Sequence, residues 1–123
     1  MKVIKVAWFE IPVSDIERAV KFYEQIFDTS IQVQDFGQLK MGVFPHEDIG
    51  GALVESKDWY SPSPTDGPLL HLHGGDDLST VLDKVEVAGG KVLIAKRQIS
   101  EALGYMGVMI DSEGNRIALR SKN

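Results

Sequence analysis

The chain has 123 residues, of which 43% are hydrophobic and 25% are charged, values typical of one soluble globular domain and not of a disordered or fibrous protein. The 13 Lys and Arg are scattered and are outnumbered by 18 Asp and Glu, so the net charge of -5 argues against nucleic acid as a partner. Cysteine is absent, which excludes disulfides, thiolate nucleophiles and cysteine-based zinc sites.

The first eleven residues are largely apolar, but we do not expect a targeting segment there. Lys5 and Glu10 interrupt the apolar run, and no small-residue cleavage site follows it. No stretch of the sequence approaches the roughly 20 apolar residues that a membrane span needs. We therefore expect a cytoplasmic protein with no membrane contact.

The first half of the chain is predicted to form a strand, a helix and three more strands. The first strand covers residues 3–13, and a helix follows over residues 15–27, where apolar residues recur at the spacing of one helical face. Ser14 and Glu17, three residues apart, have the spacing of a capping box. Residues 31–36, 39–44 and 51–55 are short β-prone runs separated by Gly and Pro residues, which is typical of strands.

The second half of the chain repeats this order after a segment rich in Pro and polar residues at 57–68. A strand is predicted over residues 69–73, then a helix over 77–88 that ends at the Gly pair 89–90. Strands are predicted at 91–95, 105–110 and 116–120, with residues 97–103 in a longer connection. The apolar residues of this helix are those of the first helix moved by 62 positions, as from Ile16 to Leu78.

The repeat predicts an α+β fold of two βαβββ modules within a single domain spanning residues 1–123. The first module covers about 1–56, the linker about 57–68 and the second module about 69–123. A four-stranded sheet with a helix on one face must still cover its other face, and the other module is the natural partner.

The segments WFEIPVSDIERAVKFY at 8–23 and DSEGNRIAL at 111–119 resemble the glyoxalase/bleomycin resistance/dioxygenase (vicinal oxygen chelate) superfamily. The resemblance implies that the two modules form an incomplete barrel with a concave cleft, which holds a divalent metal in the enzymes that use one. It places the four ligand positions at Trp8, at Glu55 or a neighbour, at Leu70 or His71, and at Ala118. Since Trp8 and Ala118 offer no metal ligand, we predict no metal and no other cofactor.

Several polar and aromatic residues are candidates for a ligand site. Glu10 and Glu55 are candidate catalytic carboxylates, because Glu10 is unexpected in an apolar strand unless a hydrated cavity surrounds it; as an alternative, it is a rim residue paired with a cation. His71 and His73 share one strand face, which is either the cavity or the solvent side, depending on a bulge at the following glycines. The predicted ligand-binding residues are Trp8, Glu10, Glu55, His71, His73 and Tyr105, with core packing as the alternative for the aromatic residues.

These residues leave three functions open. The first is a metal-independent protein that binds a small organic ligand between the modules. The second is a metal-dependent lyase, isomerase or dioxygenase of the glyoxalase type, for which a displaced metal site of Glu10, Glu55, His71 and His73 can be drawn. The third is a metal-free lyase or hydrolase that uses Glu and His side chains. The resemblance also implies a homodimer.

Overall fold

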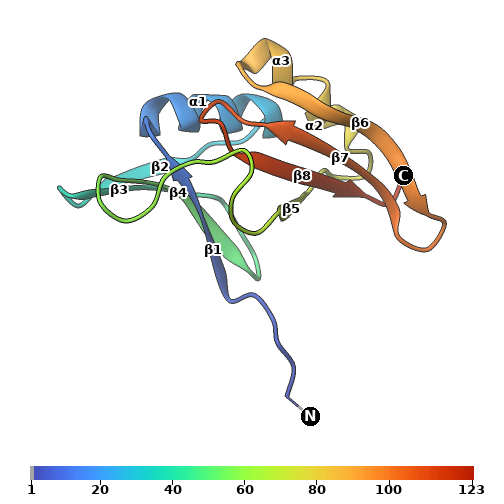
Figure 1. Cartoon of the computed structure of the whole chain (residues 1–123), viewed down its shortest axis with the longest axis horizontal. Coiled ribbons are helices and arrows are strands. Elements are labelled where there is room, and N and C mark those ends of the chain that lie inside the picture. The colour runs from blue at the N-terminus through green and yellow to red at the C-terminus, as the bar shows by residue number, and fades with distance from the viewer. Residues whose placement is uncertain (1) are drawn as a thin grey trace.

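The order of elements repeats itself along the chain, as the sequence predicts. The computed structural model describes residues 2–123 (Figure 1). The first module contains β1 (Trp8–Val13), α1 (Ile16–Phe27), β2 (Gln32–Asp35), β3 (Leu39–Val43) and β4 (Gly50–Ser56). The second contains β5 (Leu70–His73), α2 (Ser79–Leu82), α3 (Val85–Ala88), β6 (Lys91–Ser100), β7 (Gly104–Ile110) and β8 (Arg116–Ser121).

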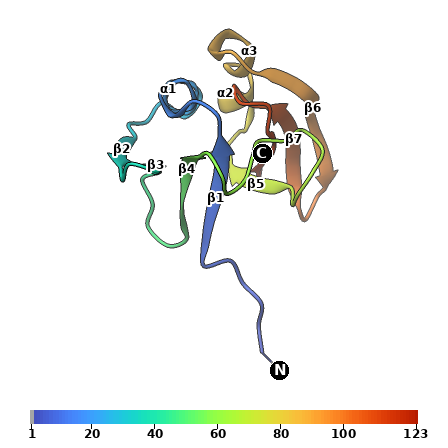
Figure 2. The same ribbon diagram turned by 60° about the vertical axis from the view of Figure 1, so that its left-hand side comes forward.

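The strands of residues 2–123 form two separate four-stranded sheets with the same topology. The strand order is β1-β4-β3-β2 in the first sheet and β5-β8-β7-β6 in the second. The first strand of each module pairs in parallel with the last, and the remaining pairs are antiparallel. The fold is therefore α+β, with two βαβββ modules that curve toward each other without closing a barrel (Figure 2).

Helix α1 forms where the apolar spacing predicts it, but its cap differs from the prediction. The residues on its buried face are Ile16, Ala19, Val20, Phe22, Tyr23 and Ile26. The capping box of Ser14 and Glu17 is wrong, because Asp15 is the N-cap and its carboxylate accepts the N–H of Arg18. The helix ends at Asp28, which adopts the left-handed conformation with φ of 53°.

The second predicted helix is two short helices, although its apolar stripe is correct. Leu78, Val81, Leu82 and Val85 are all buried. The hydrogen-bond ladder tightens at Lys84, whose N–H donates to the carbonyl of Val81 three residues earlier, and this turn separates α2 from α3. Burial of the stripe therefore does not require one continuous helix.

Two strand boundaries also differ from the sequence prediction. The first strand begins at Trp8, while residues 3–7 leave the molecule as an exposed segment (Figure 1). Strand β6 runs on to Ser100 through several register shifts with β7, so residues 97–100 are strand and not connection. The polar composition of that stretch hides the strand, because an edge strand can keep most of its side chains in water.

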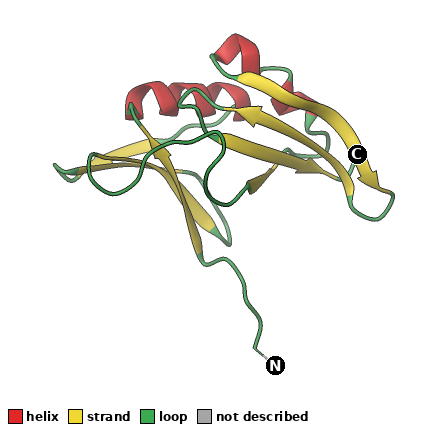
Figure 3. Ribbon diagram, viewed as in Figure 1, coloured by secondary structure: helices red, strands yellow, loops and turns green. Residues whose placement is uncertain are grey.

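Each sheet has one face covered by helices and one face free of them (Figure 3). Ile11, Leu53, Met109 and Leu119 are fully buried in the hydrophobic core with the helices. Since successive side chains of a strand alternate between faces, Glu10 projects from the opposite, uncovered face of its sheet. This alternation decides which candidate residues can reach a ligand between the sheets.

The two modules are joined by polar contacts from the turn between β7 and β8. The hydroxyl of Tyr23 in α1 donates to Asp111 Oδ2 at 2.7 Å, and both residues are buried. Arg18 forms a bidentate ion pair with Glu113, with Nε to Oε2 at 2.7 Å and Nη2 to Oε1 at 2.9 Å.

Helices long and apolar enough to span a membrane are absent from residues 2–123.

Candidate functional site

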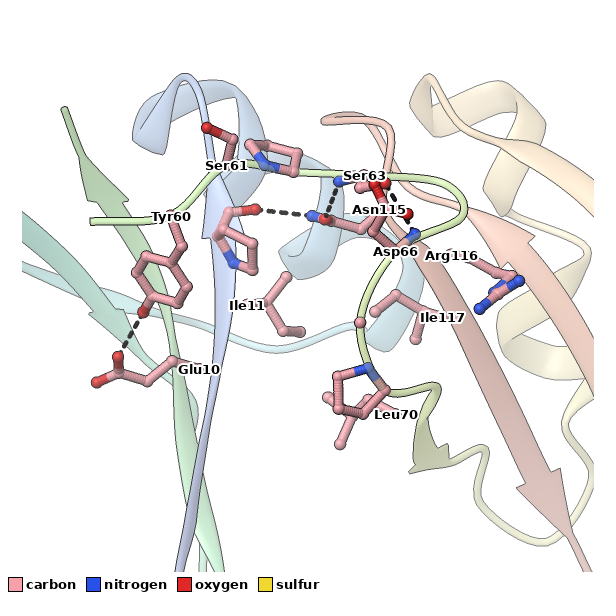
Figure 4. A pocket seen from close by; sticks show the side chains of 14 residues that line it. Glu10, Ile11, Tyr60, Ser61, Ser63, Asp66, Leu70, Asn115, Arg116 and Ile117 are labelled. Carbon is pink, nitrogen blue, oxygen red and sulfur yellow. Dashed lines mark hydrogen bonds between the residues drawn. The ribbon is translucent and has the colours of Figure 1, made fainter. Parts of the chain in front are cut away.

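A cleft of about 440 Å³ lies where the two modules meet. Strand β1 forms one wall, and the starts of β5 and β8 form the other (Figure 4). Residues 60–68 of the connecting segment pass over it and contribute to its lining. The apolar lining comes mainly from Ile11, Pro12, Pro62, Pro68, Leu70 and Ile117. The volume and the mixed lining are typical of a small-molecule site.

Glu10 lines this cleft and is held there by two donors. Tyr60 donates its hydroxyl to Glu10 Oε1 (Figure 4). Trp8 Nε1 donates to Glu10 Oε2 at 3.3 Å. Burial, followed by the hydrogen bond to Glu10 and its negative charge, raises the pKa of Tyr60 well above the usual tyrosine value. Tyr60 therefore stays a protonated donor near neutral pH and orients the carboxylate.

Asn115 fixes the other end of the cleft. Its Nδ2 donates to the carbonyl of Pro12 in β1 at 2.7 Å, and its Oδ1 accepts the N–H of Ser63 at 3.3 Å. The Ser63 hydroxyl in turn accepts the N–H of Asp66 at 2.9 Å, which bends the overlying segment. Asn115 is not among the site residues predicted from the sequence; the available signal was its position in the segment at 111–119 that resembles the superfamily.

Glu55 lies on the helix-covered face of the first sheet and does not line the cleft. Its Oε1 accepts the N–H of Ile16 at 2.8 Å, and its Oε2 lies 3.9 Å from Lys40 Nζ. The first turn of a helix has unpaired N–H groups, and Glu55 satisfies one of them. The contacts of this carboxylate are those of a cap for α1.

His71 and His73 project from the uncovered face of the second sheet and are exposed. The register of β5 with β8 is unbroken from Leu70 to His73, so the glycines that follow introduce no bulge before them. The described cleft is lined by neither histidine. Partial burial, together with the positive charge of Arg120, lowers the pKa of His71.

The two aromatic candidates lie apart from each other. Trp8 is 40% exposed and packs edge-on against His46, with 6.0 Å between ring centroids. Tyr105 packs against the core on the helix-covered face, where Lys96 Nζ lies 4.7 Å from its ring centroid. Of the six predicted ligand-binding residues, Glu10 is the one that lines the cleft between the modules.

The sequence profile of the Glyoxalase/Bleomycin resistance protein/Dioxygenase superfamily matches residues 5–119. The chain belongs to this superfamily. No curated protein matches the sequence significantly.

Several solved structures share the fold at low sequence identity. A mutant of glyoxalase I from Zea mays aligns with a TM-score of 0.74 at 17% identity, over 94% of this chain and 45% of that one, so the present chain spans about half the maize enzyme. A hypothetical protein from S. aureus aligns with a TM-score of 0.66 at 19% identity, over 98% and 95%. A mutant fosfomycin resistance protein from Listeria monocytogenes, complexed with Mn(II) and a dihydroxypropylphosphonic acid, aligns with a TM-score of 0.64 at 10% identity, over 99% and 93%.

The metal site that the superfamily implies does not fit this chain. On the uncovered faces, the implied ligand positions carry the indole of Trp8, the methyl group of Ala118 and the imidazole of His71. His71 pairs with Ala118 across β5 and β8. Glu55, the remaining candidate ligand, is turned to the helix side. Within the described residues 2–123, no three His, Asp or Glu side chains are grouped so that they could hold a metal ion. One imidazole is not enough for a divalent ion, which usually takes several protein ligands.

Proposed function

We propose that this superfamily member binds a small organic molecule in the cleft between its modules without using a metal ion. The observation that carries the proposal is the cleft itself, about 440 Å³ in volume, with the oriented carboxylate of Glu10 on one wall. Glu10 accepts hydrogen bonds and carries negative charge, so it favours ligands with a donor group such as an amine, amide or hydroxyl.

The arrangement favours binding over acid-base chemistry shared by Glu and His side chains. Glu10 lines the cleft, whereas His73 lines a separate hollow at the far end of β5 and β8. Groups that hand a proton to the same substrate must both lie within hydrogen-bond reach of it. We propose Glu10 and Tyr60 as the pair that orients the ligand. The homodimer and the cytoplasmic location remain predictions from the sequence.

The test is a thermal-shift and NMR screen of small organic compounds in buffer that contains a metal chelator. We expect some compounds to raise the melting temperature and to shift the amide signals of Glu10, Ile11, residues 115–117 and the non-proline residues among 60–67. Glu10→Gln should lower the affinity for these compounds by about tenfold, as expected for the loss of a charged hydrogen-bond partner.

The matched control is Glu55→Gln, which removes the same charge from the opposite face of the sheet. It should leave compound binding unchanged. Compounds that bind only when Mn²⁺, Zn²⁺ or Ni²⁺ is added, or that bind equally well to the Glu10→Gln variant, would contradict the proposal.

A further inference from the structure

The second sheet has an unusual charge distribution for a chain with a net charge of -5. Strands β5, β6, β7 and β8 contain five Lys and Arg residues, two His residues and no Asp or Glu. Register and alternation place His71, His73 and Arg120 on the uncovered face, because their neighbours Leu70, Leu72 and Leu119 pack into the core on the other face. The negative net charge therefore conceals a basic surface.

Arg120 is the central residue of this surface and has no carboxylate partner among residues 2–123. Its Nη2 donates to the carbonyl of Leu103 at 3.0 Å, while its Nε is buried without a hydrogen-bond acceptor. The ion pairs found among residues 2–123 are Arg18 with Glu113, Lys40 with Glu55 and Lys96 with Asp77. A partly buried guanidinium without a carboxylate partner is costly, and an anion beside it would offset that cost.

A hollow of about 370 Å³ lies beside this guanidinium. Its lining comes from the ends of β5 and β8 and from the turn between β6 and β7, and includes His73, Gly75, Leu103, Arg120 and Lys122. The lining contains three groups that can carry positive charge, and no Asp or Glu. The hollow lies at the opposite end of β5 and β8 from the cleft that Glu10 lines.

We infer that this hollow binds a small anionic group, a carboxylate or a phosphate, through Arg120 with His73 and Lys122. Guanidinium groups bind both kinds of oxyanion through charge-assisted hydrogen bonds, and here the bond from Nη2 to the Leu103 carbonyl fixes the orientation of the group. Lys122 adds a point charge at the rim, and His73 adds a ring N–H donor. The inference is independent of the proposed function, since the two sites share no lining residue.

The experiment is an NMR titration of the whole chain with inorganic phosphate and, separately, with succinate, at constant ionic strength. Saturable shifts are expected at the amides of Gly75, Gly104 and Lys122. Arg120→Gln should weaken binding by about tenfold or more, the size expected for the loss of a charge-assisted hydrogen bond. Whichever anion binds more tightly identifies the ligand class.

Two further variants keep the result interpretable. Lys91→Gln removes one positive charge at the opposite end of the same sheet and should leave the affinity unchanged. His73→Gln alters an exposed residue, so it should fold normally, and it should weaken binding severalfold even if Arg120→Gln proves unstable. Three results would overturn the inference: no saturable shifts, shifts that lie instead at residues 10–12 and 60–68, or a loss of affinity in Lys91→Gln equal to that in Arg120→Gln.

Discussion

At the scale of single residues, the carboxylates of this chain differ because of where the backbone turns them. Glu10 lines the cleft, Glu55 accepts the first N–H of α1, and Glu113 joins the modules with a side chain that has no exposed surface. Glu113 accepts the N–H groups of Ser14 and Asp15 at 3.0 and 2.9 Å, besides both contacts from Arg18. A buried carboxylate with this many donors is held in its charged form.

Replacing Glu113 with Gln should therefore destabilise the protein in a pH-dependent way. Burial by itself would raise the pKa of Glu113, but the hydrogen bonds from Arg18 and from the backbone outweigh it and lower the pKa. Because the folded-state value is the lower one, the stabilisation is complete above the ordinary glutamate pKa and is lost as the pH falls through the folded value. We expect Glu113→Gln to lose about 2 kcal/mol at pH 7 and less at pH 3.

Urea denaturation of the two proteins at pH 7 and pH 3 measures this difference. Arg18→Gln removes the partner that is half exposed and provides a milder comparison. Equal stabilities at pH 7, or a difference that grows toward pH 3, would show that Glu113 is not a stabilising charge.

At the scale of elements, sequence periodicity predicts most of the fold because burial imposes it. The stripe of α1 and the alternation along the central strands are direct consequences of one buried face. The same reasoning fails for the split between α2 and α3 and for the end of β6, since neither changes which residues are buried. It also leaves the facing of Glu55 open, because a shift of one residue in strand register reverses every side chain.

Close packing between β1 and β4 gives a prediction at this scale. Gly51 pairs with Phe9, and a β-carbon at Gly51 would collide with the Phe9 ring, which stacks on Phe44 at 5.9 Å between centroids. Gly51→Ala should cost about 1 to 3 kcal/mol, the range for overpacking a filled site. Chemical denaturation measures the loss of stability. Gly37→Ala is the comparison: its added methyl group meets no neighbour, so its cost comes from the positive φ and not from a collision. A Gly51→Ala variant as stable as the parent protein would mean that the ring can move aside.

At the scale of the whole molecule, the cleft exists because the modules are tied together at one end by the turn from Asp111 to Asn115. Asp111 accepts hydrogen bonds from Tyr23 and from Asn115, and Asn115 reaches both β1 and the segment over the cleft. The repeat predicts that two modules meet, and the superfamily resemblance predicts that a cleft lies between them. The residues that shape the cleft come from an irregular segment, whose path no periodicity specifies.

Asn115→Ala should therefore loosen the cleft as well as destabilise the chain. It removes the contacts to the Pro12 carbonyl and the Ser63 N–H, so we expect a loss of about 2 kcal/mol and faster hydrogen exchange at residues 60–68. Ser112→Ala, in the same turn, removes a hydroxyl whose hydrogen bond within residues 2–123 is to Glu113, and it should change exchange in residues 60–68 little. Unchanged exchange in the Asn115→Ala variant would show that the segment is held by other contacts.

Metal-independent binding in the cleft is tested most directly by calorimetry. The tightest compound from the screen is titrated into protein that has been stripped of metal with a chelator. We expect binding at one site with the same affinity before and after stripping, and weaker binding to the Glu10→Gln variant. Loss of binding on stripping, with recovery after one equivalent of a divalent ion, would contradict this expectation.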